Sequence, residues 1–307
     1  MPGGASSLTY RGVYRQRPVV VKVAPAGLEP IAHRDVLRQA RILRALSVTD
    51  VPVPEVLWED AGAPPEVPPL FVMSLVDGAS VEPLFDLGRV AEAGTTLAAR
   101  FRAAAVVLAR LHRIDPASVG LGEDPVVGLR DEVDRWSRAL QTVDPALVPG
   151  WHPVGAALLS TLPTPLAPAI VHGDFRLGNL LADADHINAV IDWEIWSLGD
   201  PRVDLGWFLI NCDPATYRRD TPHVGAAPAT SELAARYRRT LGRDICDLAW
   251  FEALACFKSA ATWALIIKHN RRRHRDPATE AMAAALPRLL GRAARILNRS
   301  ECGPAEE

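Results

Sequence analysis

Three oxygen-bearing side chains lie close together in the second half of the sequence. Asp174 stands in the run VHGDFRLGN, Asn179 ends that run, and Asp192 stands in VIDWE, after a further apolar segment. A carboxylate can accept or orient the proton of an attacking hydroxyl group. Carboxylate and amide oxygens are also the ligands that Mg²⁺ prefers. The set therefore predicts phosphoryl transfer, with one acid acting on a hydroxyl group and two ligands holding Mg²⁺ against nucleotide phosphates.

A β-hairpin is expected to bring these side chains together. The short apolar runs at residues 179–182 and 189–191 flank the turn sequence Asp-Ala-Asp at residues 183–185. Two strand-like runs around such a turn are typical of a hairpin. Asn179 would then lie at the end of one strand and Asp192 at the end of its neighbour.

The same motifs resemble a known family. HGDFRLGN keeps the Asp-to-Asn interval of the protein-kinase pattern H-R-D-L-x-x-x-N, and IDWE places an acid where kinases have D-F-G. With LGDPRVDLGW, they resemble the aminoglycoside phosphotransferase and choline kinase-like family. DWEIWSLGDPRVDLGW is similar, more narrowly, to the kinase-like proteins associated with acyl-CoA dehydrogenases. The match runs from Gly3 to about Asn270.

The resemblance implies an α+β, protein kinase-like bilobal fold. Residues 1–77 would form a nucleotide-binding lobe with a small antiparallel β-sheet and one helix, and residues 78–307 a larger, mainly helical catalytic and substrate-binding lobe. In the family a further strand precedes the Gly-rich loop; this chain begins inside that loop, so we expect the first strand to be missing. Helical periodicity predicts helices over residues 33–46, 97–112, 129–140, 231–241 and 248–269, and a last one from Pro277.

The resemblance also implies roles for the central residues. Asp174 would be the catalytic base or orienting group, and Asn179 and Asp192 would bind Mg²⁺. His172 would brace the loop by hydrogen bonding, and Asp204 would be a buried acid that ties the loop from below. Asp200, between a glycine and a proline, is expected to serve a turn.

The N-terminal part is expected to hold ATP. Lys22, inside the strand-like run VVVKV, resembles the strand lysine that contacts nucleotide phosphates in kinases. Small residues let backbone N–H groups approach phosphate oxygens, and the loop expected to cover them contains Gly3, Gly4, Ser6 and Ser7. The adenine ring would meet the backbone of the hinge at Met73, Ser74, Leu75 and Val76.

Gln39 departs from the kinase pattern. Kinases carry a glutamate at the corresponding helix position, where it pairs with the strand lysine. Helical spacing places Gln39 near Ile42 and Leu43, on the face turned toward the sheet. We expect its amide to accept a hydrogen bond from Lys22 without supplying a charge.

Composition indicates an ordinary globular protein. The 307 residues include 34 Lys and Arg against 36 Asp and Glu, a net charge of -2 that gives no footprint for nucleic acid or an anionic membrane. Four widely spaced cysteines and the lack of a secretory signal favour a cytoplasmic location. The oligomeric state is left open.

We therefore expect an ATP- and Mg²⁺-dependent phosphotransferase that acts on the hydroxyl group of a small molecule, for which the narrower resemblance favours a hydroxyacyl compound or its CoA ester. One alternative is an aminoglycoside or amino-alcohol kinase, since aromatic faces can hold a cationic substrate. Another is a pseudokinase module that binds a nucleotide or acyl-CoA without turnover. A protein kinase is disfavoured, because no A-P-E motif follows and little chain separates Asp192 from LGDP.

Overall fold

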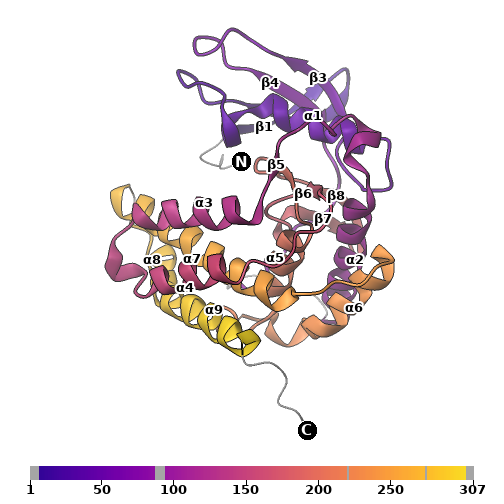
Figure 1. Ribbon diagram of the computed structural model, residues 1–307. Helices are drawn as coiled ribbons and strands as arrows, with labels where there is room; N and C mark the ends of the chain where they lie inside the picture. Colours follow the sequence, from indigo (N-terminus) through magenta and orange to yellow (C-terminus); the bar gives the residue numbers. More distant parts are fainter. Residues whose placement is uncertain (1–6, 87–93, 220, 274, 302–307) are drawn as a thin grey trace.

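The computed structural model describes residues 7–86, 94–219, 221–273 and 275–301. Its N-terminal part is an antiparallel sheet of β1 (Leu8–Tyr14), β2 (Arg17–Val23), β3 (Val56–Asp60) and β4 (Leu70–Ser74). The strand order is β1-β2-β4-β3, so β1 and β3 are the edge strands. Figure 1 shows this sheet, with α1, at one end of the molecule and the other helices beyond it. The expected α+β kinase-like architecture is confirmed, and the boundary at residue 77 stays a prediction.

α1 (Val36–Leu46) packs its apolar face, with Ile42 and Leu46, into the core. The helix begins later than residue 33, where the sequence predicted it. Asp35 keeps an extended backbone and caps the helix, because its carboxylate accepts a hydrogen bond from the Arg38 amide at 3.0 Å. Residues Ala32–Arg34 form a separate 3-10 turn before this cap.

The rest of the described chain is mainly helical, as expected. Its helices are α2 (Gly94–Arg113), α3 (Leu129–Gln141), α4 (Trp151–Ser160), α5 (Arg202–Cys212), α6 (Thr230–Leu241), α7 (Leu248–Arg272), α8 (Pro277–Ala281) and α9 (Leu286–Glu301). α4 and α5 were not predicted. Every residue of α5 is buried, so the segment lacks the polar face that reveals a helix in a sequence. The predicted last helix is interrupted by the 3-10 turn Met282–Ala285, which separates α8 from α9.

The predicted hairpin is present. β7 (Leu180–Asp183) pairs antiparallel with β8 (His186–Val190). Beside it, β6 (Ala169–Val171) and β9 (Ser197–Gly199) pair antiparallel, and β5 (Val126–Val127) extends this small sheet. The sequence predicted β7 and β8 but not β5, β6 and β9, which are too short for a recognisable alternation.

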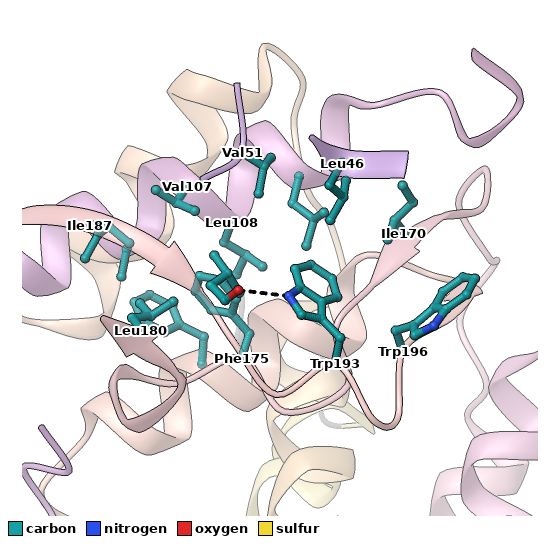
Figure 2. Packing of buried hydrophobic residues seen from close by; sticks show 14 of the residues in the cluster. Leu46, Val51, Val107, Leu108, Ile170, Phe175, Leu180, Ile187, Trp193 and Trp196 are labelled. Atoms are coloured by element: carbon teal, nitrogen blue, oxygen red, sulfur yellow. Dashed lines mark hydrogen bonds between the residues drawn. The ribbon is translucent and has the colours of Figure 1, made fainter. Parts of the chain in front are cut away.

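One apolar core joins the sheet side to the hairpin side. Leu46 of α1, Leu108 of α2 and Phe175 belong to the same buried cluster as Trp193 and Trp196. Figure 2 shows Leu46, Leu108 and Phe175 gathered near the Trp193 ring, with Trp196 farther out on the side of Ile170. Side chains from segments far apart in the sequence therefore fix where the N-terminal sheet and α1 lie relative to the hairpin.

A second buried cluster surrounds α7 and includes side chains of α3, α4, α5 and α9. Among the described residues, α7 is the one helix long and apolar enough to cross a membrane by length and composition. However, 72% of its most apolar stretch is buried inside the structure. Figure 1 shows α7 lying among other helices, and a core helix meets the same two criteria.

Asp200 does more than occupy a turn. Its carboxylate accepts hydrogen bonds from Arg202 Nη2 at 2.7 Å and Nε at 2.9 Å, and both side chains are almost fully buried. Arg202 Nη2 also donates to the Thr164 carbonyl at 2.6 Å. The expected turn role is confirmed, because the Arg202 amide donates to Asp200 Oδ1 at 3.0 Å and the Val203 amide to the Asp200 carbonyl at 3.0 Å. The buried ion pair with Arg202 was not predicted.

Asp200→Asn should lower the free energy of unfolding by about 3 kcal/mol, because it removes the buried carboxylate of the pair and leaves Arg202 only the half-exposed carboxylate of Asp247 at 3.3 Å. Glu55→Gln is the matched control: its partner Arg17 is 59% exposed, so the change should stay below about 1 kcal/mol. Urea denaturation of the three proteins measures both effects. Equal stability of the two variants would contradict a structural role for the Asp200–Arg202 pair.

Candidate functional site

A cavity of about 580 Å³ lies between the sheet and the hairpin. Its lining includes all the described residues that the sequence proposed for the nucleotide and the metal: Ser7, Lys22, Met73, Ser74, Leu75, Val76, Asn179 and Asp192. Gly3, Gly4 and Ser6 lie outside the described residues. The lining also includes Val20, Leu181 and Ile191, which the sequence did not single out. The volume falls in the range of small-molecule sites.

The hinge side of this cavity is tied to the hairpin. The Ala79 amide donates to the Ala182 carbonyl at 2.9 Å, and Asn188 Nδ2 donates to the Asp77 carbonyl at 2.9 Å. Gly78 has φ +131, and a Cβ there would approach the Ala182 backbone to 2.9 Å. Glycine is therefore required where the chain passes from the sheet to the rest of the molecule.

Lys22 bridges two segments of the cavity wall. Its Nζ donates to Gln39 Oε1 at 3.1 Å, the contact expected from the sequence, and to Asp192 Oδ1 at 3.1 Å. Gln39 is 2% exposed, and its Nε2 is buried without a hydrogen-bond partner among the described residues. An unpaired buried donor costs about 1–3 kcal/mol. Asp35 does not replace a kinase glutamate here, since it caps α1.

Asp192 projects from a constrained backbone. Its φ is +66, in the left-handed region that non-glycine residues seldom adopt. The preceding residue is fixed because the Ile191 amide donates to the Asn179 carbonyl at 2.9 Å. The following residue is fixed because the Trp193 indole donates to the Val190 carbonyl at 3.0 Å. The Asp192 side chain is 40% exposed, so its carboxylate is accessible from the cavity.

Asp174 is held at both carboxylate oxygens. Trp207 Nε1 donates to Oδ1 at 2.9 Å, and Asn179 Nδ2 donates to Oδ2 at 2.8 Å. Asn179 Nδ2 also donates to the Asp174 carbonyl at 2.8 Å. Because these bonds use the amide nitrogen, the amide oxygen of Asn179 remains available to a metal. Asn179 thus connects Asp174 to the cavity that Asp192 lines.

Arg176 belongs to the site, although the sequence analysis assigned it no role. Its Nε lies 3.1 Å from both carboxylate oxygens of Asp174, and its Nη1 pairs with Glu82 Oε2. Glu82 in turn accepts a hydrogen bond from the Gly178 amide at 2.8 Å. Burial raises the pKa of Glu82, an effect that the Arg176 charge opposes. The arginine follows Asp174 within HGDFRLGN, and that spacing was the available signal.

Asp204 supports the loop from α5, where the sequence placed a buried acid. Its Oδ2 accepts from the His172 amide at 2.6 Å and its Oδ1 from the Gly173 amide at 2.9 Å. His112 Nε2 lies 3.5 Å away. Burial alone would raise the pKa of Asp204, but His112, His172 and Lys258 lower it below its ordinary value.

His172 connects this loop to the segment before Asp192. Its Nε2 lies 2.9 Å from the Ile191 carbonyl, and the Asp174 amide donates to its Nδ1 at 3.1 Å. Gly173 has φ +85, and a Cβ there would meet the Ile195 carbonyl oxygen at 2.8 Å. Asp174 and Asp192 are therefore positioned by a shared set of hydrogen bonds.

Lys258 of α7 is a buried cation beneath the loop that the sequence analysis missed. Its Nζ donates to the Gly173 carbonyl and lies 4.3 Å from the centre of the Trp207 ring. Burial lowers the pKa of Lys258, although the Glu132, Asp174 and Asp204 carboxylates oppose this effect. A single lysine within the apolar pattern of a helix gives no sign of such a contact.

Asp204→Asn should destabilise the protein by about 3 kcal/mol at pH 7, because it removes the charge that two backbone amides bind. A depressed pKa contributes stability above the unfolded-state value, and that contribution is lost as the pH falls through the folded-state value. The stability gap between wild type and variant should therefore narrow below pH ~4.

Urea denaturation at pH 7 and pH 3 measures this gap, with Asp183→Asn as the control. Asp183 is exposed at the end of β7, so its change should have little effect at either pH. A gap for Asp204→Asn that is absent at pH 7, or equal at both pH values, would contradict the anchoring role.

Comparison with known proteins places this geometry in a family. A model of the phosphotransferase enzyme family matches residues 1–245. The mouse (Mus musculus) acyl-CoA dehydrogenase family member 10 is 30% identical over 211 residues, which cover 66% of this chain. The match covers 19% of the mouse protein, so the chain spans only a small part of that relative.

Two solved structures are similar over nearly the whole chain. One is a protein of Ralstonia eutropha provisionally named an aminoglycoside phosphotransferase, with a TM-score of 0.78 and 22% identity, covering 96% of this chain and 91% of that one. The other is a thermostable mutant of aminoglycoside phosphotransferase APH(4)-Ia in complex with AMP-PNP and hygromycin B. Its TM-score is 0.63 at 19% identity, with 99% of this chain and 93% of that one covered. The chain belongs to the phosphotransferase enzyme family and has its kinase-like fold.

Proposed function

We propose that the protein is an ATP- and Mg²⁺-dependent phosphotransferase that acts on the hydroxyl group of a small molecule. The observation that carries this proposal is the connection of Asp174, through Asn179, to the cavity where Lys22 meets Asp192. Two oxygen-bearing side chains and a cation thus line a cavity of suitable size, and Asn179 links them to the carboxylate that would act as the general base. Phosphoryl transfer depends mainly on such positioning and charge stabilisation.

The cavity would bind the nucleotide. The adenine ring would contact the hinge from Met73 to Val76, and the phosphates would reach Lys22 and the loop that contains Gly3, Gly4, Ser6 and Ser7. The AMP-PNP bound to the related APH(4)-Ia structure supports this placement. A phosphate would compete with Asp192 for Lys22, whose charge then stabilises the leaving diphosphate.

Asn179 and Asp192 would hold Mg²⁺. The described residues contain no cluster of three or more His, Cys, Asp or Glu that could enclose a metal ion by itself. Two protein oxygens suit Mg²⁺, because this ion usually keeps several waters and binds through one or two carboxylates plus substrate phosphates. The metal would neutralise charge on the phosphates.

Asp174 would accept the proton of the substrate hydroxyl group as its oxygen attacks the γ-phosphorus. The new O–P bond forms while the bond to the β,γ-bridging oxygen breaks, which leaves ADP and a phosphomonoester. Trp207 and Asn179 fix the carboxylate orientation for this step. Arg176, within 3.1 Å of the same carboxylate, would stabilise the negative charge nearby.

For the acceptor we propose a hydroxyacyl compound or its CoA ester. The similarity to acyl-CoA dehydrogenase family member 10 supports this class. Hygromycin B in the related complex favours an aminoglycoside instead. A pseudokinase module is favoured by Gln39, which holds Lys22 without a charge.

We further propose that the protein is cytoplasmic and acts without nucleic-acid or membrane partners. We propose that its two lobes divide at residue 77.

Thermal shifts with hydroxyacyl-CoAs, aminoglycosides and amino alcohols, each with Mg²⁺ and a nonhydrolysable ATP analogue, distinguish these acceptors, since a ligand stabilises the fold it binds. Stabilisation by hydroxyacyl-CoAs alone supports the proposed class. Stabilisation by another class corrects it. A nucleotide shift with no ATP consumption in any mixture supports the pseudokinase.

Asp174→Asn should reduce kcat by on the order of 10²- to 10⁴-fold, because a general base is lost. The affinity for Mg·ATP should remain close to wild type, since Asp174 acts on the acceptor. Steady-state kinetics and calorimetric nucleotide titration measure the two quantities. Asp185→Asn in the exposed hairpin turn should change neither. Wild-type turnover in Asp174→Asn would disprove its assignment.

Asp192→Ala should instead weaken Mg·ATP binding, with partial rescue by excess Mg²⁺ or Mn²⁺, because a metal carboxylate is removed. Asn179→Ala should show a milder defect of the same kind. Nucleotide titrations at limiting and at high Mg²⁺ measure this dependence. Unchanged affinity of Asp192→Ala at limiting Mg²⁺ would rule out the metal role.

A further inference from the structure

α1 and the segment after Asp192 hold each other through one pair of residues. Arg38 Nη2 donates to the Trp196 carbonyl at 2.5 Å, and the Trp196 indole nitrogen donates to the Arg38 carbonyl at 3.1 Å. The Arg38 guanidinium also lies 4.2 Å from the centre of the Trp196 ring. Two reciprocal hydrogen bonds and a cation–π contact thus join the same two residues.

Trp196 of this pair is set in the apolar core, and Arg38 is partly buried against it. Trp196 is 1% exposed and belongs to the cluster that also contains Leu46 of α1 and Ile170 of β6. Figure 2 shows the Trp196 ring beside Ile170, with Leu46 above the neighbouring Trp193. Burial strengthens the contacts with Arg38, because fewer water molecules compete for the donors.

The pair closes a ring of contacts around Lys22. Arg38 is next to Gln39, which accepts a hydrogen bond from Lys22, and Trp196 follows Asp192, the second partner of Lys22. If α1 shifts away from the Asp192 segment, Lys22 loses one of these two partners. The distance between α1 and that segment therefore determines whether Lys22 is held at the cavity.

Because Gln39 is neutral, α1 needs a further contact to stay close to the Asp192 segment. A glutamate would attract the Lys22 ammonium by charge, whereas the amide oxygen of Gln39 supplies a single neutral acceptor, and its Nε2 is left unpaired in the core. The contact itself thus contributes little to holding α1 in place. Arg41 of α1 adds a two-bond ion pair with Asp124, at 3.0 and 2.6 Å, but this pair ties α1 to the segment after α2 and not to the Asp192 segment.

We propose that Arg38 and Trp196 form a latch that keeps α1 against the Asp192 segment and so assembles the nucleotide site in the ligand-free protein. Both are positioning residues that act through Gln39, Lys22 and Asp192. The latch replaces the charge that Gln39 does not supply. As a proposal about the nucleotide site, it rests on the proposed function.

Arg38→Met tests the latch, because it keeps an unbranched apolar stem and removes the guanidinium donors. The dissociation constant for a nonhydrolysable ATP analogue with Mg²⁺ should rise by on the order of tenfold. Backbone amides of α1 should exchange hydrogen faster in the ligand-free variant. Arg44→Met is the matched control on the same helix: Arg44 pairs with Glu59 of β3 and should change neither quantity. Trp196→Phe, which removes the indole N–H, should repeat the Arg38→Met result.

Gln39→Glu supplies the decisive comparison. In the Arg38→Met background it should restore most of the lost affinity, because a charged pair with Lys22 then holds α1. In the wild-type background, where the latch already holds α1, the gain should be smaller, and this non-additivity distinguishes coupling from general destabilisation. The latch would be overturned if Gln39→Glu raised the nucleotide affinity by the same factor in both backgrounds. It would also be overturned if Arg38→Met and Arg44→Met had the same affinity and the same exchange rates. Failure of the wild type to bind the analogue would disprove the proposed function instead, and the exchange of α1 amides would still decide the latch.

Discussion

The ion pair between Lys22 and Asp192 is the interaction on which the rest of the site depends. It joins residues 170 positions apart, one in a strand of the N-terminal sheet and the other just beyond the hairpin. Lys22 is nearly buried, and a charge in such a place needs a partner in good geometry. The sheet, α1 and the hairpin must therefore all be in place before the pair can form. A bound nucleotide would break this ion pair, because Lys22 would then contact phosphate and Asp192 would bind the metal. In the ligand-free protein the pair therefore holds both side chains at the positions that the proposed site needs.

Asp174, the proposed general base, is supported differently. Asp174 stands on a loop whose backbone amides, at His172 and Gly173, donate to the buried carboxylate of Asp204. A buried carboxylate requires such donors, and the loop amides require an acceptor, so each satisfies the other. Arg176 then balances the charge of Asp174 at 3.1 Å. The Asp204 carboxylate and the Arg176 ion pair together fix the loop, so little reorganisation is needed for the proposed chemistry.

The sequence predicted those elements whose pattern is local. The hairpin followed from two apolar runs around an acidic turn, and the amphipathic helices followed from their spacing. It could not predict α5, which is buried on all sides and has no polar face. It also missed the partners of Arg176 and Lys258, because each is set by tertiary packing: Glu82 meets Arg176 across 94 positions and Gly173 meets Lys258 across 85. Asp200 pairs with Arg202 only two positions away, but the burial of that pair is set by packing. The predicted nucleotide and metal residues among those described line one cavity, and the predicted supports His172 and Asp204 contact the loop, whereas Arg176 and Lys258 could not be recognised in the sequence.

The most direct test of the central claim follows the γ-phosphate itself. Phosphorus NMR of the protein with Mg·ATP and a hydroxylated acceptor distinguishes transfer from hydrolysis and from binding without turnover. The account predicts that the γ-phosphate resonance of ATP declines while that of a phosphomonoester grows in equal amount, only when Mg²⁺ and the acceptor are both present. Release of inorganic phosphate alone, or unchanged ATP with acceptors that demonstrably bind, would contradict it.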